Sequence, residues 1–260
     1  MVWALAGDRD ANCHAGSGVA DSTEDKLLGG RVRLRQPRVG GLRAGLDAVL
    51  LAAMMPAKPG QLVLEAGCGS GAAMLCLAAR VPGVKLRAVE RDAGLAALAT
   101  ENAALNGVLA EVVVGDVMDR ALARRLGPYD HAMANPPYWP GGSAPPAPGR
   151  AAATHEQGAG LADWAAFMAA GLRAGGWLAL VLPAARFDAG VAALRAAGCG
   201  SQRLLPLWPY AGIAAKRLLL LARKGGRGPG VVLPGLVLHE AGGGFAAAAE
   251  AVLRDAAALP

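Results

Sequence analysis

The segment 61–81, QLVLEAGCGSGAAMLCLAARV, constrains the fold of this chain more than any other. A short apolar run leads directly into Gly67, Gly69 and Gly71, and a helical pattern of small and apolar residues follows. Glycines let the backbone turn tightly and approach a ligand closely, with the first N–H groups of the next helix pointing at it. In a doubly wound sheet, ligands bind where this turn lies, beyond the carboxyl ends of the strands. The segment therefore predicts a ligand site between a strand and a helix.

Apolar runs and helical patterns alternate along the rest of the chain. We expect strands over 61–67, 84–90, 110–116, 129–137, 176–183, 202–209 and 215–225, and helices over 45–56, 72–81, 92–107, 161–174 and 186–198. Near-continuous apolar strands between helices are typical of a parallel sheet covered on both faces. The last two strands are close enough in sequence to pair as a hairpin. The pattern predicts a doubly wound α/β fold, with a mostly parallel seven-stranded sheet and one antiparallel strand.

Less regular segments flank this unit. Residues 1–22 are small and polar without periodicity, so we expect a flexible tail. Residues 23–58 form a basic segment that ends in a helix and could lie over the ligand as a lid. Residues 59–228 are expected to form the ligand-binding domain. In 229–260 the strand-like LVLHE and an alanine-rich helix predict an extension packed on that domain.

The composition indicates a cytoplasmic protein. The chain is 54% hydrophobic with a mean hydropathy of +0.34, but no apolar run approaches the roughly 20 residues that span a bilayer. The N-terminal stretch lacks the basic start and apolar core of a signal peptide. The four cysteines, at 13, 68, 76 and 199, have no paired spacing, which indicates reduced thiols rather than a disulfide framework or metal site. We expect a soluble protein without a metal.

Basic residues are concentrated in two blocks without acids, within a net charge of +6. Six lie between Lys26 and Arg43, and five lie between Lys216 and Arg227. If the blocks share a face, they would attract phosphate backbones. The alternative is an ordinary solvated basic surface. The candidate substrate-binding residues are Arg33, Arg35, Arg38, Arg43, Lys216, Arg217, Lys224 and Arg227.

Three acids follow or end the first three strands of the predicted domain. Glu90 could accept hydrogen bonds from both hydroxyls of a ribose, and Asp116 could accept one from an adenine amine. Glu65, beside the glycines, would repel a pyrophosphate but attract the ammonium of S-adenosylmethionine. Each acid alone could be a solvated charge at a strand end. Although the loop also satisfies the G-x-G-x-x-A pattern of dinucleotide sites, the three acids together favour S-adenosylmethionine.

The fourth strand ends in Asn135-Pro136-Pro137-Tyr138. The prolines make a stiff, extended corner, and the simplest interpretation is an exit turn in which Asn135 caps its own backbone. In a sheet of this order the fourth strand lies beside the first. The quartet would then overhang the ligand site.

The joint occurrence of EAGCGSG, AVERD, VVGD and ANPPY resembles class I methyltransferases of the N-P-P-Y group, which methylate amino or amide nitrogens. The resemblance covers about 26–240. LLGGRVRLRQPRVGGLRAGLDAVLLAA and AKRLLLLARKGGRG are similar to bacterial tRNA (adenine-N6)-methyltransferases that act beside the anticodon of valine tRNA. The resemblance implies a Rossmann-like fold, S-adenosylmethionine as cofactor, and tRNA or another RNA as partner.

The resemblance also implies roles for individual residues. Asn135 and the carbonyl of Pro136 would each accept a hydrogen bond from one N–H group of an amine, and Pro137 would complete the corner. Tyr138 would stack on the base, and Trp139 would either stack as well or cover the loop. Asp47 would help to close the cofactor site, although a carboxylate near a helix N-terminus is an equally good interpretation. The expected cofactor-binding set is Asp47, Glu65, Gly67, Cys68, Gly69, Gly71, Glu90, Arg91, Asp116, Val117 and Asn135.

Other functions remain open from the sequence. N-P-P-Y enzymes also methylate the amide of protein glutamine or other RNA and DNA bases. A silent RNA-binding relative would keep the fold without activity. A nicotinamide-dependent oxidoreductase is disfavoured by Glu65. We expect a methyltransferase acting on an exocyclic amine, with adenine N6 in tRNA as the first hypothesis.

Overall fold

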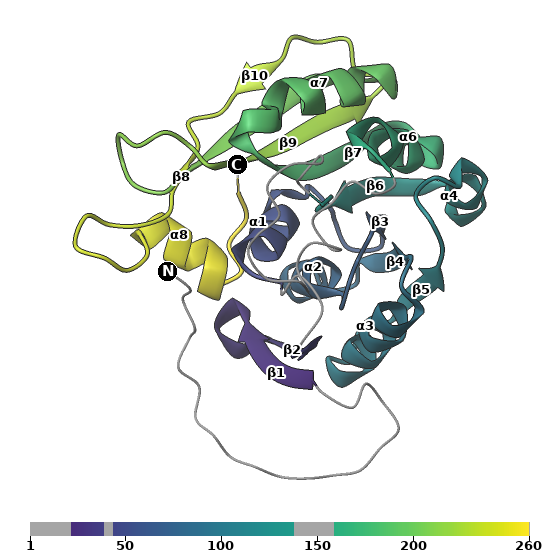
Figure 1. Cartoon of the computed structure of the whole chain (residues 1–260), viewed down its shortest axis with the longest axis horizontal. Coiled ribbons are helices and arrows are strands. Elements are labelled where there is room, and N and C mark those ends of the chain that lie inside the picture. The colour runs from purple at the N-terminus through teal and green to yellow at the C-terminus, as the bar shows by residue number, and fades with distance from the viewer. Residues whose placement is uncertain (1–21, 39–43, 138–158, 260) are drawn as a thin grey trace.

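The structure, a computed structural model of the chain, describes residues 22–38, 44–137 and 159–259. Its centre is a sheet in the order β10-β8-β9-β7-β6-β3-β4-β5 (Figure 1). Strand β11 also pairs with β8. The strands are β3 (Leu62–Ala66), β4 (Lys85–Glu90), β5 (Ala110–Val114), β6 (Tyr129–Ala134), β7 (Leu172–Pro183), β8 (Cys199–Trp208), β9 (Arg217–Lys224), β10 (Val231–Val232) and β11 (Leu236–Val237).

The sheet has the predicted doubly wound order. Strands β5, β4, β3, β6 and β7 run parallel, whereas β9 is antiparallel to both of its neighbours, β7 and β8. These seven strands confirm the predicted mostly parallel sheet with one antiparallel member. The chain leaves β3 toward β4 and later returns on the other side of β3 as β6. Ligands bind at such a reversal of strand order, beyond the carboxyl ends of the strands.

Helices cover both faces of the sheet. They are α1 (Leu46–Met54), α2 (Ala72–Arg80), α3 (Ala93–Leu105), α4 (Arg120–Leu126), α6 (Leu161–Ala170), α7 (Phe187–Ala196) and α8 (Ala247–Arg254), with short 3-10 turns η1 (Leu28–Gly30) and η2 (Ala184–Arg186). One core lies under α1, α2, α3 and α8, and the other under α4, α6 and α7. In β7, Ala179 and Val181 face the first core, while Leu178 and Leu180 face the second. Burial of both faces explains why the strands are apolar without alternation.

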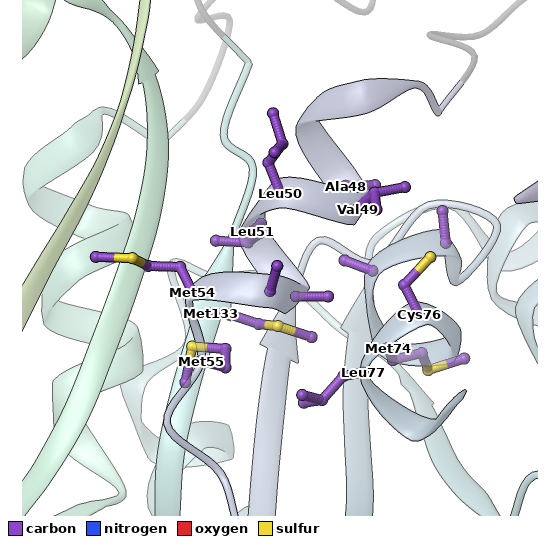
Figure 2. Packing of buried hydrophobic residues seen from close by; sticks show 14 of the residues in the cluster. Ala48, Val49, Leu50, Leu51, Met54, Met55, Met74, Cys76, Leu77 and Met133 are labelled. Atoms are coloured by element: carbon purple, nitrogen blue, oxygen red, sulfur yellow. The ribbon is translucent and has the colours of Figure 1, made fainter. Parts of the chain in front are cut away.

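Helices α1 and α2 lie side by side in the first core (Figure 2). Met133 of β6 is fully buried with them. Arg80, in the last turn of α2, donates to the carbonyl oxygens of Ala52 and Met55, at 2.7 and 2.6 Å. The Ala52 carbonyl also accepts from the Met55 N–H at 3.3 Å. Because carbonyls at a helix end lack the usual intrahelical partner, the Arg80 hydrogen bonds stabilise the end of α1. The glycine loop therefore follows β3 into a helix that is fixed in place.

An antiparallel hairpin, β1 (Ser22–Leu27) and β2 (Val32–Pro37), precedes α1. From the sequence, only a basic segment was predicted here, although VRLRQP alternates apolar and polar residues as a half-buried strand does. Val32 and Leu34 are buried against the domain, while Arg33 and Arg35 face outward. The hairpin carries Lys26, Arg33 and Arg35 of the first basic block, and all three are exposed.

Several boundaries differ from the predictions. The third and fourth strands end at Val114 and Ala134, earlier than predicted, and α4 was not predicted. The predicted helix 161–174 stops at Ala170 because a tertiary contact ends it. A Cβ on Gly171 would lie 2.3 Å from the carbonyl oxygen of Ala123. The Tyr129 hydroxyl donates to the Met168 carbonyl at 2.7 Å and accepts from the Gly171 N–H at 3.2 Å. The chain then enters β7 at Leu172.

Predicted helix ends are confirmed elsewhere. Asp92 caps α3 by accepting a hydrogen bond from the Leu95 N–H at 2.9 Å, as Asp does at such positions. Asn106 ends the same helix. None of the helices within 22–38, 44–137 and 159–259 is long and apolar enough to cross a membrane.

Candidate active site

The glycine loop lies between the end of β3 and the start of α2. The N–H groups of Gly67 and Cys68 both donate to the Val89 carbonyl, at 2.7 and 3.1 Å, which turns the chain toward β4. Gly67 has φ +65°, and a Cβ there would lie 2.4 Å from Cη2 of Trp164. A Cβ on Gly69 would meet no atom within 4 Å among the described residues. The loop is thus supported from below at Gly67 and open at Gly69, as a cradle for a ligand must be.

Glu90, at the end of β4, is oriented by the loop. Its Oε2 accepts from the Gly69 N–H at 2.8 Å, and its Oε1 accepts from the Asp92 N–H at 3.0 Å. Each carboxylate oxygen has two lone pairs. Both oxygens therefore keep the capacity to accept a further hydrogen bond, such as one from a ribose hydroxyl.

Glu65, in β3, is only 4% exposed and its Oε2 accepts from the Met74 N–H at 2.7 Å. Burial raises the pKa of its carboxyl to about 8, and Glu90 adds to this rise by repulsion, while the Met74 N–H opposes it. The carboxyl is therefore mostly neutral at pH 7. A ligand cation beside it would favour the carboxylate.

The third acid lies beyond β5. Asp116 is two residues past the end of that strand and accepts from the Met118 N–H at 2.8 Å. Val117 beside it is buried. Cys68 is also buried, and burial raises the pKa of its thiol, which disfavours the thiolate. Arg91 is exposed at the end of β4.

Asn135 and Pro136 continue β6 beyond the sheet. Ala134, the last residue of β6, pairs with Ala66, the last residue of β3. Asn135 and Gly67 therefore follow paired positions on neighbouring strands, which lie about 4.8 Å apart. Pro136 is buried and Pro137 is half-buried. Tyr138 and Trp139 lie outside the described residues.

Comparison with known proteins identifies the family. Residues 44–147 match the model of the methyltransferase small domain. A relative from Aeromonas salmonicida, named tRNA1(Val) (adenine(37)-N6)-methyltransferase, is 32% identical over 207 residues, 78% of this chain and 85% of the relative. The chain belongs to this methyltransferase family. Proteins of the same name from Shewanella amazonensis, 30% identical over 71% of this chain and 79% of the relative, and from Aeromonas hydrophila, 36% identical over 56% and 62%, agree.

A solved structure supports the fold of this methyltransferase. The crystal structure described as a predicted O-methyltransferase from Agrobacterium tumefaciens superposes with a TM-score of 0.68 at 26% identity, over 82% of this chain and 98% of that chain. A SAM-dependent O-methyltransferase from Thermotoga maritima, at 18% identity, shares the fold with a TM-score of 0.51. Together with the family match, this fold makes the chain a class I, S-adenosylmethionine-dependent methyltransferase.

The residues of this methyltransferase fit S-adenosylmethionine. The space at Gly69 admits a ligand close to the backbone, and the Glu90 oxygens retain lone pairs for hydroxyl donors. Glu65 supplies a buried carboxyl that a cationic amino-acid tail would ionise. No group of three His, Cys, Asp or Glu side chains suited to a metal occurs in the part of the chain that the structure describes.

Two residues of the predicted sites meet across the molecule. Asp47, in the first turn of α1, and Arg217, at the start of β9, form an ion pair with Nε and Oδ2 3.3 Å apart. Their side chains are 26% and 41% exposed. Asp47 was predicted to lie at the cofactor and Arg217 at the substrate. The pair joins the helix over the cofactor edge to the second basic block.

The remaining basic residues do not gather on one surface. Lys216 and Arg217 lie near the end of β7, whereas Lys224 pairs with Cys199 at the other end of β9. Eight residues of strand extend about 27 Å, so Lys224 lies far from Lys216. Arg227 lines an open groove of about 450 Å³ beside Gly198 and Gly200, also at that far edge.

Arg33 and Arg35 both pair with Glu24 of β1, at 2.8 and 3.9 Å. Arg38 is exposed after β2, and Arg43 lies outside the described residues.

Sequence reasoning missed Trp164 of α6. Its side chain is 8% exposed and its ring lies under Gly67. Its indole Nε1 has no hydrogen-bond partner among the residues that the structure describes. A single aromatic residue in a helical pattern gives no signal of this contact, because the same pattern is typical of any helix that packs on a hydrophobic core. His131 of β6 contacts groups around it in the sheet: its Nδ1 accepts from the Trp177 N–H at 3.3 Å and its Nε2 lies 3.1 Å from Gln61 Oε1.

Proposed function

We propose that this methyltransferase methylates the N6 amine of an adenine in tRNA, and that Asn135 and Pro136 hold that amine. The observation that carries the proposal is the pairing of Ala134 with Ala66, which sets Asn135 beside the glycine loop. The relatives named tRNA1(Val) (adenine(37)-N6)-methyltransferase support tRNA as the acceptor and adenine as the base.

The glycine loop and the three acids would bind the cofactor. Glu90 would accept hydrogen bonds from the ribose hydroxyls, and Asp116 from the adenine amine. Glu65 would interact with the ammonium group, since a buried carboxyl beside a cation is favoured in its charged form. When bound, S-adenosylmethionine supplies a methyl group on a sulfonium sulfur, and the neutral thioether that remains after transfer is a good leaving group.

Asn135 and Pro136 would act on the acceptor amine. The lone pair of an exocyclic amine is delocalised into its ring, which makes the nitrogen a poor nucleophile. The side-chain oxygen of Asn135 and the carbonyl oxygen of Pro136 can each accept a hydrogen bond from one of its two N–H groups. Holding both bonds localises the lone pair and aims it toward the cofactor, which is both an orientation and an electrostatic effect. We expect Tyr138 to stack on the base, a contact worth about 1–3 kcal/mol.

Basic residues at the carboxyl edge would bind the RNA backbone. Lys216 is exposed beside Arg217, and Arg38 is exposed after β2. Side chains of this kind attract phosphates through a salt-dependent interaction that does not read sequence. A base in a folded loop must be splayed out to enter such a site, because paired and stacked bases hide their amines.

The decisive experiment identifies the methylated nucleoside. The purified protein is incubated with tritiated S-adenosylmethionine and total tRNA from a strain that lacks its own adenine methylation, and the tRNA is digested. We expect the label in N6-methyladenosine. A second reaction with total protein tests the glutamine alternative. Label in protein, or in another nucleoside, would replace the proposed acceptor, and no label with intact cofactor binding would indicate a silent RNA-binding protein.

A further inference from the structure

Asn102 of α3 is a fully buried polar residue, with an exposed fraction of 0%. Its Oδ1 accepts from the Arg35 N–H at 2.9 Å, and its Nδ2 donates to the Arg35 carbonyl at 2.9 Å. The same Nδ2 also donates to the Ser70 carbonyl of the glycine loop, at 2.9 Å. A single amide therefore connects the hairpin, helix α3 and the cofactor loop.

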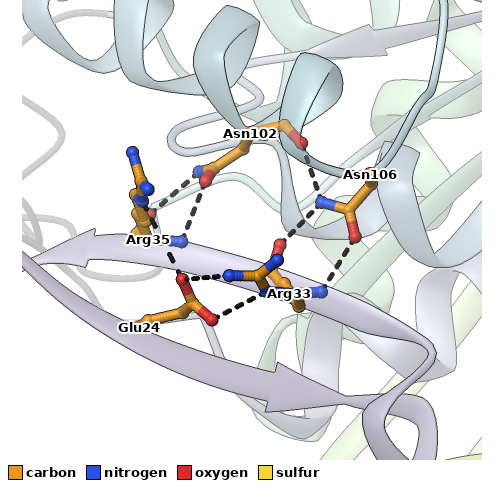
Figure 3. A network of polar contacts seen from close by, with 5 residues as sticks. All are labelled: Glu24, Arg33, Arg35, Asn102 and Asn106. Atoms are coloured by element: carbon orange, nitrogen blue, oxygen red, sulfur yellow. Dashed lines mark hydrogen bonds and ion pairs between the residues drawn. The ribbon is translucent and has the colours of Figure 1, made fainter.

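Asn106, one turn later, makes a similar contact without reaching the loop. Its Oδ1 accepts from the Arg33 N–H at 2.9 Å, and its Nδ2 donates to the carbonyls of Arg33 and Asn102, both at 2.7 Å (Figure 3). Residues four apart on a helix share a face, and residues two apart on a strand share an edge. The two asparagines thus pair with β2 as a neighbouring strand would. They differ in that Asn102 also contacts Ser70.

The Ser70 carbonyl belongs to the most adaptable part of the loop. Gly69 and Gly71 on either side have φ +54° and +88°, and glycine has the largest conformational freedom to lose on ordering. The Gly71 N–H, on the other side of the Ser70–Gly71 peptide, donates to the Cys68 carbonyl at 2.9 Å. This peptide unit is therefore held at both ends, and Asn102 makes one of the two contacts.

We propose that Asn102 is a positioning residue of the cofactor site, which orders the glycine loop through Ser70 and ties that order to the docked hairpin. Ser70 is buried, at 7% exposure. Loss of the amide would leave its carbonyl without this partner, and buried carbonyls that lose a partner are costly. The loop would then adopt other conformations, and binding would have to restore the original one. The inference rests on the cofactor site proposed above and not on the identity of the methyl acceptor.

The test compares Asn102→Ala with Asn106→Ala, because each variant removes the pairing with one residue of β2. The full chain is titrated with S-adenosylhomocysteine by calorimetry in the absence of RNA, and thermal unfolding is measured in parallel. We expect Asn102→Ala to weaken binding about tenfold and Asn106→Ala to weaken it less than about twofold, since only the first affects the loop. Asn102→Ser, which keeps a small donor, should fall between them and provides a folded variant if the alanine variant is not recovered.

Amide exchange gives a readout that loss of stability alone would not produce. The Gly71 N–H, just before α2, should exchange faster relative to the amides within α2 in Asn102→Ala or Asn102→Ser, but not in Asn106→Ala. Equal losses of affinity in the Asn102 and Asn106 variants, or unchanged affinity in a folded Asn102 variant, would overturn the proposal. A failure of the tRNA assay would leave this result standing, because no RNA is present in the titration.

Discussion

The two edges of the sheet use acidic residues in different ways. At the carboxyl edge, Glu65 and Glu90 accept hydrogen bonds from main-chain N–H groups, those of Met74 and Gly69. At the amino edge, Glu111 pairs with Arg87 at 2.6 Å, and Asp130 pairs with Arg173 at 2.5 Å through one oxygen while its other oxygen accepts from the Leu62 N–H at 2.8 Å. These pairs border an open groove of about 1030 Å³.

This difference separates ligand binding from structural support. A carboxyl group that accepts hydrogen bonds from main-chain N–H groups is fixed in direction and keeps lone pairs for a further donor. A carboxylate paired with an arginine is neutralised by the protein itself. Ion pairs with exposed side chains contribute little to stability, so we expect loss of the exposed Arg173 side chain at the amino edge to leave methyl transfer unchanged. At the carboxyl edge, the groups beside the ligand site, Glu65, Glu90 and Asn135, should be the most sensitive to substitution.

The largest effect should follow substitution of Asn135. We expect Asn135→Ala to reduce methyl transfer about a hundred- to a thousandfold, because the amine loses an acceptor that orients it at the cofactor. S-adenosylhomocysteine affinity should change less than about threefold. Single-turnover transfer to tRNA and calorimetry measure the two quantities separately.

Arg173→Ala, at the amino edge, is the control for Asn135→Ala and should retain transfer. Equal losses of transfer and of cofactor affinity in Asn135→Ala would contradict the assigned role. Such a result would indicate that Asn135 binds the cofactor and has no separate role in holding the amine.

Glu65 should make stability depend on pH. Its pKa of about 8 in the folded chain lies above the ordinary carboxyl value, so the folded state holds a proton that the unfolded state releases. The free energy of unfolding should therefore fall as pH rises from about 4.5 to 8, by at most about 1.4 kcal/mol per pH unit. Glu65→Gln cannot ionise and should lack this fall.

Urea denaturation of both chains at pH 5, 6.5 and 8, without cofactor, tests this expectation. The difference in stability between Glu65→Gln and the unchanged chain should grow in favour of the variant with pH. Parallel stability curves would show that Glu65 keeps an ordinary pKa in the folded chain. Glu111→Gln, at the amino edge, provides a control that should not change the slope.

The sequence predicted what depends on local pattern. Apolar strands, the glycine loop and the Asp92 cap are all encoded within short segments, and the structure confirms them. The end of α6 was missed because Gly171 is fixed by Ala123, far away in the chain. Asn102 was missed for the same reason, since its partner Arg35 is 67 residues away. Lys216 and Lys224 belong to one basic block in sequence, but a strand carries them to opposite edges.

The smallest effect should come from the Asp47–Arg217 pair, which links the two predicted functions at the carboxyl edge. Because both side chains are partly exposed, Arg217→Ala should cost less than about 1 kcal/mol of stability. It should nevertheless weaken tRNA binding and lower the slope of log K against log salt by about 0.7–0.9, the value for one phosphate contact. Salt-dependent binding titrations measure this slope.

Asp47→Ala tests the same ion pair from its other side, because loss of the carboxylate and loss of the guanidinium should change tRNA binding in opposite directions. Removal of the carboxylate takes away one negative charge beside the Arg217 guanidinium, so tRNA binding should stay the same or strengthen, and the salt slope should not fall. Arg173→Ala should leave both quantities unchanged, since its arginine lies at the amino edge. If Arg217→Ala and Arg173→Ala had the same small effect, binding would reflect net charge alone. If Asp47→Ala weakened tRNA binding as much as Arg217→Ala, the pair would act by fixing α1 against β9 rather than by presenting a cation to the RNA.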